Sequence, residues 1–441
     1  MNSKKEFRKE VLIWTLLFLV MVLAPLYLAL VGHDRPGRGF LFEFGVGLGF
    51  IGIALMGLQF VLTARFKNVA ASFGTDALLN FHRQAGYVAY GFILGHVVVL
   101  LAASSYVWNF FDPRVNAPRA FALVSVLFLM TLLVALTIWR KRFNIPYEWW
   151  RISHAVFAFL ILFIGLAHIL MVGHYISELW KQVLWIGLAA FAMGMLVHVR
   201  IVKPWKMWKQ PYKATNVWQE TEDVWTLEAK PAGHQGFSFK AGQFAWITLG
   251  STPFSLQQHP FTIASSSEAE GRYEFTIKEL GDFSSTVKEV DPGTKLYLEG
   301  PYGAFTLNPK AESAFFVVGG IGITPVMSML RTMHDRKDQR PCKLIYGNPD
   351  WKSAVYSEEL SELEDYLNLE VIHVLENPPA GWNGQKGLIS REMILNELPE
   401  NCDNTEFYVC GPEPLMDLAE TVLRRQGVPL YNVHSERFNI V

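Results

Sequence analysis

The sequence contains little cysteine, little charge and no excess of charge of one sign. Only three of its 441 residues are cysteine (Cys342, Cys402 and Cys410), and none forms a CxxC pair. Neither an iron–sulfur cluster nor a disulfide framework is therefore indicated. Charged residues make up 18% of the chain, with 39 Lys and Arg against 40 Asp and Glu. The absence of a basic excess argues against a nucleic-acid partner.

Apolar residues are abundant instead. They make up 51% of the chain, which is too much for an ordinary soluble protein. Six apolar runs, each long enough to span a bilayer, occupy 11–31, 40–62, 81–103, 120–139, 152–173 and 179–202. The first run follows a basic segment, as in a signal peptide. It is too long for one and no small-residue cleavage site follows, so we interpret it as an uncleaved span.

The loops between these runs differ in charge. Lys and Arg gather at the N-terminus, in the second and fourth loops and after the sixth run, whereas the other loops are less basic. The positive-inside rule then places both termini in the cytoplasm. We expect an integral, multi-pass protein of the cell membrane.

Two pairs of histidines lie within the apolar runs. His82 and His96 belong to the third run, and His154 and His168 belong to the fifth, with the same spacing in each. This spacing is just under four helical turns, so each pair shares one helix face, roughly 21 Å apart along the axis. The loop charges place His82 with His154 near the inner side and His96 with His168 near the outer side. The pattern predicts two haem irons, each held by two imidazoles. The alternative is polar side chains that bond between helices.

Other residues of the apolar runs are weaker candidates. Arg83 and Arg151 stand beside the inner histidines, where they are candidates for haem propionates or simply ordinary inside-facing cations. Four glycines of the third and fifth runs would leave room for a flat macrocycle: Gly86, Gly91, Gly95 and Gly165. We interpret His33, His174 and His198 as loop or interface residues, because they lack partners at the same spacing.

The composition changes after the sixth run. We expect a membrane domain over 1–203 and a basic, Trp-rich linker over 204–212, suited to the headgroup region. Short β-type runs over 213–308 predict a small antiparallel barrel. Strands alternating with helices over 309–441 predict a parallel, nucleotide-binding sheet.

Two strings in the barrel segment are candidates for flavin binding. In 259–266, a strand backbone and hydroxyls favour a flavin and its ribityl chain, through His259, Pro260, Phe261, Thr262 and Ser265. In 278–287, a helix start favours a pyrophosphate, through Lys278, Gly281, Ser284, Ser285 and Thr286. Each string alone also fits an ordinary turn or helix N-cap.

The last segment contains two loops that suit a dinucleotide. The loop at 317–325 follows a strand and does not match the GxGxxG fingerprint. Its candidate residues are Gly319, Gly320 and Gly322, then Thr324 as N-cap and Pro325 as first helical residue. A second strand end supplies Cys410, Gly411 and Pro412 at a predicted switch point of the sheet. Cys410 is equally well a small buried residue.

The choice between NADPH and NADH depends on the segment after the second strand of this sheet. Lys352 is a candidate for a 2′-phosphate, together with Ser353, and otherwise lies in a solvated turn. Tyr356 either stacks on adenine or packs under the next helix. We favour NADPH and keep NADH as the alternative.

Taken together, these strings resemble the NADPH oxidase and ferric reductase superfamily, and small prokaryotic NADPH oxidases most. The resemblance implies a six-helix bundle with two b-type haems, followed by a ferredoxin–NADP reductase-like module: an FAD barrel and an α/β nucleotide domain. It pairs His82 with His154 and His96 with His168. It also implies catalytic roles near the nicotinamide for Cys410 and Glu436, and an aromatic cover on the flavin for Phe438.

The implied function is electron transfer from cytosolic NAD(P)H through FAD and two haems to oxygen outside, which forms superoxide. The alternatives are a ferric-chelate reductase, a haem subunit that serves a quinone or protein acceptor, and a redox sensor. Two residues that animal oxidases use for oxygen reduction have no counterpart: position 100 is Leu, and the outer half of the second run offers only Glu43. No EF-hand precedes the first run, so we expect no obligatory protein or calcium activator.

Overall fold

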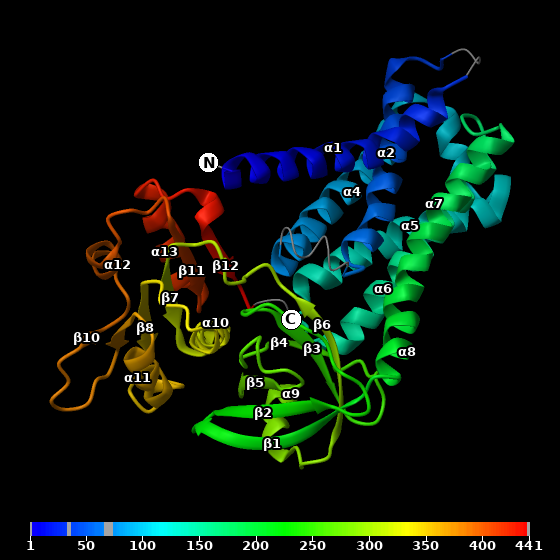
Figure 1. Cartoon of the computed structure of the whole chain (residues 1–441). Helices are drawn as coiled ribbons and strands as arrows, with labels where there is room; N and C mark the ends of the chain where they lie inside the picture. Colours follow the sequence, from blue (N-terminus) through cyan, green and yellow to red (C-terminus); the bar gives the residue numbers. More distant parts are fainter. Residues whose placement is uncertain (1, 33–36, 66–73, 439–441) are drawn as a thin grey trace. The chain divides into compact units, whose positions relative to one another are not determined.

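The computed structural model describes residues 2–32, 37–65 and 74–438 (Figure 1). His33 lies outside the described residues. The chain divides into two compact units, one formed by Met1–Arg65 with Leu78–Ile201 and the other containing Val202–Val441. Each unit is described by itself below.

The first unit is helical. Its elements are α1 (Asn2–Leu30), α2 (Phe40–Leu62), α4 (Thr75–Ala103), the 3₁₀ turn η1 (Ser105–Phe110), α5 (Pro113–Trp139), α6 (Tyr147–Val172) and α7 (Leu179–Val197), which continues into a π-helical turn (His198–Val202). Among the described residues, six helices are long and apolar enough to cross a membrane, which confirms the six predicted spans. The third to fifth helices begin earlier than predicted, because polar residues extend their first turns. The Asp112 side chain, for example, accepts the backbone N–H of Arg114 at the start of α5.

Helix α2 packs against α1, α6 and α7 and carries a row of glycines toward α4. A Cβ atom added at Gly52 would lie 2.7 Å from Ile93 of α4, and one at Gly45 would lie 2.9 Å from Leu100. Small residues let helix backbones approach closely in a membrane, where water provides no driving force for association. The glycines of α2 therefore set its distance from the helix that carries His82 and His96.

The second unit begins with the short helix α8 (Lys203–Trp208) and an antiparallel barrel-like sheet. The strand order is β4-β3-β6-β1-β2-β5. The strands are β1 (Tyr212–Thr221), β2 (Val224–Pro231), β3 (Phe244–Leu249), β4 (His259–Thr262), β5 (Tyr273–Lys278) and β6 (Lys295–Tyr302), and the short helix α9 (Asp282–Ser285) follows β5. Apolar side chains of these strands form one buried cluster, as expected for a small barrel.

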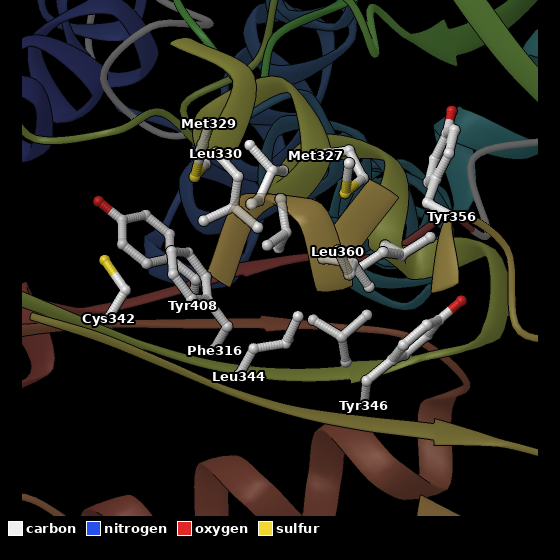
Figure 2. Close-up of a cluster of buried hydrophobic side chains, with 14 of the residues drawn as sticks. Phe316, Met327, Met329, Leu330, Cys342, Leu344, Tyr346, Tyr356, Leu360 and Tyr408 are labelled. Atoms are coloured by element: carbon white, nitrogen blue, oxygen red, sulfur yellow. The ribbon is translucent and has the colours of Figure 1, made fainter. Parts of the chain in front are cut away.

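A parallel sheet follows, with strand order β10-β9-β8-β7-β11-β12. Its elements are β7 (Ser313–Gly319), α10 (Ile323–Arg336), β8 (Cys342–Asn348), α11 (Ser357–Tyr366), β9 (Leu369–Leu375), β10 (Gln385–Lys386), α12 (Arg391–Glu397), β11 (Thr405–Cys410), α13 (Glu413–Arg425) and β12 (Val433–Glu436). Neighbouring residues of β7 point to opposite faces: Phe316 packs with residues of α10 and α11, whereas Phe315 packs with residues of α13. Figure 2 shows the first of these clusters.

Helix α10 joins the sheet to the barrel. The Ser328 hydroxyl donates to the carbonyl of Ser265 at 2.9 Å, and the backbone N–H of Ser267 donates to the Thr332 hydroxyl at 2.9 Å. Arg331 donates to Glu274 of β5 at 2.9 Å and to Glu359 of α11 at 2.6 Å. Residues 328, 331 and 332 share one helix face, so a single face of α10 connects the two subdomains.

Candidate functional site

The four histidines of the membrane unit meet in the predicted pairs. The ring centroids of His82 and His154 lie 6.1 Å apart, and those of His96 and His168 lie 6.4 Å apart. Two imidazoles that bind one metal from opposite sides, through bonds of about 2 Å, have centroids about 6 Å apart. Each pair therefore has the separation that a bis-imidazole iron site requires.

A backbone hydrogen bond orients His96. Its Nδ1 lies 2.8 Å from the carbonyl oxygen of Gly45, which can only accept, so Nδ1 carries the proton. The Nε2 lone pair is then available for a metal, in the manner of partners that orient metal ligands. A Cβ atom at Gly49 would lie 2.6 Å from the ring. The sequence interpretation missed Gly45 and Gly49, although their four-residue spacing in an apolar helix is a signal of close packing.

In the inner pair, His154 has weak side-chain partners, and His82 interacts with the backbone of Gln59. The Thr137 hydroxyl lies 3.5 Å from Nδ1 of His154, and the Trp150 indole donates to that hydroxyl at 3.4 Å. The Trp150 ring also stands 5.2 Å from the His154 ring. The inner histidine of α6 is thus positioned by side chains rather than by a backbone carbonyl.

The predicted propionate cations have different surroundings. Arg83 is exposed and donates to Asn80 at 2.8 Å, and Arg151 is partly buried. Two arginines that the sequence interpretation missed interact electrostatically with the pairs: Arg200, in the π-helical turn, with His154, and Arg119 with His168. Nothing in the sequence distinguished these two arginines from the other Lys and Arg residues of the inner side or of the loops.

A cavity surrounds the outer pair. Its lining is mostly apolar and includes His96 and His168, with Gly49 and Gly165 among the small residues. Gly86 and Gly91, which were predicted to make room for a macrocycle, have nothing within 4 Å of an added Cβ. Space is therefore open beside both glycines, and their role stays a prediction. The small residues that line the outer cavity include Gly49 of α2 and Gly165 of α6.

Polar side chains collect at one part of this cavity. Arg38, His174 and Tyr175 line it. The Arg38 backbone N–H donates to Glu43 at 2.9 Å, and the Tyr175 hydroxyl donates to the same carboxylate. His174 lies in the loop between α6 and α7, as predicted, and lines the cavity of the outer pair, which was not predicted.

The two predicted flavin strings meet in the barrel. Phe283 of α9 lies with its ring 4.4 Å from that of His259 and 5.8 Å from that of Phe261, both in β4. Pro260 and Thr262 complete that strand. One face of β4 and the start of α9 are therefore adjacent, as a site for one extended cofactor requires.

Some predicted flavin residues have hydroxyls that are already bonded. The Ser284 hydroxyl accepts the N–H groups of Leu280 and Gly281 and donates to the Gly281 carbonyl, which uses its whole capacity. The Ser265 hydroxyl donates to the backbone carbonyl of Arg272 and accepts from the backbone N–H of Glu274. These two residues shape their loops. Ser285 and Thr286 donate to helix carbonyls, at Gly281 and Phe283, and keep their acceptor sites, while Lys278 pairs with Asp223 at 3.2 Å.

The two nucleotide loops pack backbone against backbone. A Cβ atom at Gly322 would lie 2.5 Å from the carbonyl oxygen of Cys410, and one at Gly411 would lie 2.9 Å from the nitrogen of Gly319. Pro412 lies beside Gly319 and is N-cap of α13. The glycines are thus required by the contact between the loops, and Gly320, with φ of 53°, is required by its own backbone.

The start of α10 differs from the sequence expectation. A 3₁₀ turn (Gly320–Gly322) precedes the helix, and the N-cap is Gly322 rather than Thr324. The Thr324 hydroxyl donates back to Ile321 at 3.1 Å, and Pro325 stands at the third helical position. The glycines allow the chain to turn two residues earlier than the Thr-Pro signal suggested.

Cys410 and Glu436 are partners across β11 and β12. The Cys410 thiol is fully buried and lies 3.4 Å from the backbone carbonyl of Glu436. The Glu436 carboxylate reaches the barrel, since a Cβ atom at Gly303 would lie 3.2 Å from its Oε1. Phe438, 44% exposed, follows two residues later. The predicted catalytic residues therefore lie at the junction of barrel and sheet.

The segment after β8 forms a closed turn. The Ser353 hydroxyl donates to the carbonyl of Asp350 at 3.0 Å, and the Ser353 N–H donates to the Asp350 carboxylate at 2.9 Å. Lys352 is exposed. Tyr356 is buried under α11, where its hydroxyl bonds to Thr276 and burial raises its pKa. Of its two interpretations, packing under the helix describes its position, and stacking on adenine does not.

Three family models match successive parts of the chain. Residues 48–165 match the ferric reductase like transmembrane component, residues 207–306 an FAD-binding domain and residues 316–421 an oxidoreductase NAD-binding domain. The matches cover α2 to α6, the barrel and the parallel sheet in turn.

The curated relatives that the chain resembles include reductases, each matched over part of the chain. The chain is 34% identical to NADH-cytochrome b5 reductase 1 of Dictyostelium discoideum over 167 residues, 37% of this chain and 58% of the relative. It is 28% identical to NADH oxidoreductase HCR of Escherichia coli over 232 residues, 51% of this chain and 66% of the relative. The first relatives are thus matched over about three-fifths of their length.

Among solved structures, a ferredoxin reductase in carbazole 1,9a-dioxygenase is 26% identical, with a TM-score of 0.46, over 52% of this chain and 69% of that chain. The assignment of the chain's architecture rests on the order of the three family matches. The chain is a multi-pass membrane protein with the architecture of the ferric reductase and NADPH oxidase-like superfamily, in which FAD-binding and NAD-binding domains follow a ferric reductase-like membrane component.

Proposed function

We propose that this protein is a transmembrane NAD(P)H oxidase that passes electrons from cytoplasmic NAD(P)H to oxygen on the outer side and forms superoxide. The observation that carries the proposal is the pair of bis-imidazole sites, with centroid separations of 6.1 and 6.4 Å, in a chain that continues into FAD-binding and NAD-binding domains. We place it in the cell membrane with both termini in the cytoplasm.

The chain's own residues hold the cofactors in this proposal. His82 with His154 and His96 with His168 hold two b-type haems, and β4 with α9 holds FAD. When bound, FAD and haem convert a two-electron donor into one-electron transfers. The glycine loops at 319–322 and 410–412 admit the dinucleotide backbone, and Glu436 at the junction orients the nicotinamide.

The outer cavity supports a small acceptor. His96 and His168 would both be used in holding the iron, so we place the acceptor against the residues that line the cavity. Arg38 and His174 line that cavity, and Glu43 fixes Arg38. A fixed cation there would favour an anionic product such as superoxide, since preorganised charge stabilises charge that develops.

An assay of the purified protein tests the acceptor. With FAD and NADPH in air, we expect reduction of cytochrome c that superoxide dismutase abolishes, because the electrons reach cytochrome c only through superoxide. The measurement is the rate at 550 nm with and without the dismutase. A rate that the dismutase leaves unchanged would contradict the oxidase proposal.

A ferric-chelate reductase is the second candidate, because residues 48–165 match a ferric reductase-like component. The same preparation, without oxygen and with a ferric chelate, distinguishes the two. Under the oxidase proposal, adding oxygen diverts most electrons from the chelate, whereas a dedicated reductase keeps its rate.

We assign the 2′-phosphate of NADPH to Lys352. Its side chain is exposed at the carboxyl end of β8, where a parallel sheet presents its ligands. Lys352→Ala should lower kcat/KM for NADPH by about tenfold to a hundredfold and leave that for NADH unchanged, since a charge-assisted hydrogen bond contributes about 1.5–3 kcal/mol. Lys386→Ala, at another exposed lysine of the same sheet, is the control. An unchanged ratio of the two kcat/KM values in Lys352→Ala would refute the assignment.

A further inference from the structure

Helix α8 belongs to the barrel. The apolar stretch Leu179–Trp208 has 30 residues, more than the ~20 that a bilayer core requires, so its last part emerges. Lys203 donates to Glu299 at 2.9 Å and to the Tyr302 hydroxyl at 3.1 Å, both in β6, and Met207 is buried. These inward contacts fix which face of α8 turns outward.

The outward face is aromatic and continues onto a barrel loop. Trp205 and Trp208 are 49% and 58% exposed, and Phe254 and Leu256 of the loop between β3 and β4 are 43% and 38% exposed. The Trp208 and Phe254 rings meet edge to face at 6.2 Å. Four large apolar side chains, from two segments 46 residues apart, thus share one surface.

Exposed lysines lie on α8 and on the strands β1 and β6 next to the loop. Lys206 and Lys209 lie on α8, and the Lys209 ammonium stands 3.8 Å from the centre of the Trp205 ring. Lys213 of β1 is directly opposite Lys295 of β6, and the Lys295 carbonyl accepts the N–H of Gly250 at the start of the loop. Like charges opposite each other are unfavourable in a sheet. Within the described part of the chain none of these four lysines forms an ion pair, so their charge is not compensated by the protein.

We propose that this basic-aromatic surface, formed by Trp205, Lys206, Trp208, Lys209, Lys213, Phe254, Leu256 and Lys295, docks on the anionic lipid headgroups of the cytoplasmic leaflet. Trp at the headgroup level and Lys toward anionic lipid are the combination that membrane surfaces select. A protein partner is the poorer fit, because protein interfaces are depleted in lysine. The positive charge of the lysines complements the negative charge of the lipid.

Docking has a direct consequence for the barrel. The loop that carries Phe254 and Leu256 leads into β4, which starts at His259. Lipid contact at this loop therefore restrains the strand that we assign to the flavin. The proposal itself does not depend on the flavin assignment, since it rests on exposed side chains and charge alone.

A spin label measures the depth of the loop in full-length protein in lipid nanodiscs. The background variant is Cys402→Ser, in which the two remaining cysteines, Cys342 and Cys410, are buried. The label is attached at Phe254→Cys. The matched control carries the label at Leu388→Cys, since Leu388 is also an exposed apolar residue. We expect the label at 254 to collide several-fold more with oxygen, which concentrates in lipid, than with an aqueous nickel complex. The label at 388 should show the reverse.

Changing the lipid composition distinguishes anionic lipid from the other possible binding partners of the basic-aromatic surface. With anionic lipid the label at 254 should be immersed, and with zwitterionic lipid, or after Lys213→Gln with Lys295→Gln, immersion should fall. Equal aqueous accessibility at 254 and 388 in anionic nanodiscs overturns the proposal. Dipolar broadening between labels would reveal a second copy on the surface and also overturns it. Leu256→Cys serves as a second labelling site.

Discussion

Replacing His96 or His168 with leucine should remove the outer haem and leave the inner one. An iron held from both sides loses half of its protein ligands in either variant, and the outer cavity is otherwise apolar. We expect the haem content to fall from two to one per chain, and superoxide formation to fall by more than tenfold. The measurements are the pyridine haemochrome content and the dismutase-sensitive reduction of cytochrome c.

Two comparisons make this result specific. His198→Leu removes a membrane-unit histidine outside the pairs and should keep both haems. In the His96 variant, NADPH should still reduce the remaining haem, because His82 and His154 are intact. Two haems per chain in either outer-pair variant would refute the assignment of the ligands.

Replacing Arg331 with alanine should strongly destabilise the second unit. The Arg331 side chain is 18% exposed and pairs with Glu274 on the barrel and Glu359 on α11. Its removal leaves Glu359 without its cation and Glu274 with Arg272 alone, a loss of about 3–5 kcal/mol for a buried pair. The midpoint of thermal unfolding, followed by near-ultraviolet circular dichroism of the purified protein, should fall by about 10 °C.

Helix α10 offers its own control. Arg336 pairs with Glu268 at 2.6 Å, but both side chains are almost half exposed. Arg336→Ala should therefore cost less than about 1 kcal/mol, since exposed ion pairs contribute little. Similar losses in the two variants would mean that burial of Arg331 does not determine its contribution.

The length of the apolar runs predicted the six spans, and the helical spacing together with the loop charges predicted the histidine pairing. Two side chains that are fourteen residues apart on a helix lie on the same face, whatever surrounds the helix. The groups that contact those histidines depend on how the helices pack, and a local sequence pattern does not predict helix packing. Gly45, Gly49 and Arg119 were therefore missed, and the room that Gly86 and Gly91 leave for a macrocycle stays a prediction.

The same distinction applies to the second unit. The loops at 319–322 and 410–412 were predicted to act together because strand ends of a parallel sheet meet at one edge. Individual hydroxyls were less predictable. Ser265 and Ser284 bond to neighbouring backbone groups, and Tyr356 turns into the core at φ of 62°, which no propensity of tyrosine suggests.

His96 and His154, one histidine of each pair, differ in how easily mutation could tune their surroundings. His96 bonds to a main-chain carbonyl, so no change of side chain at residue 45 can delete its partner. His154 is placed by a threonine hydroxyl, which a single codon change would remove. Over evolutionary time the outer site should therefore be constant in chemistry and intolerant of added bulk at Gly45 and Gly49. The inner site should vary among relatives, through residue 137, without losing its fold.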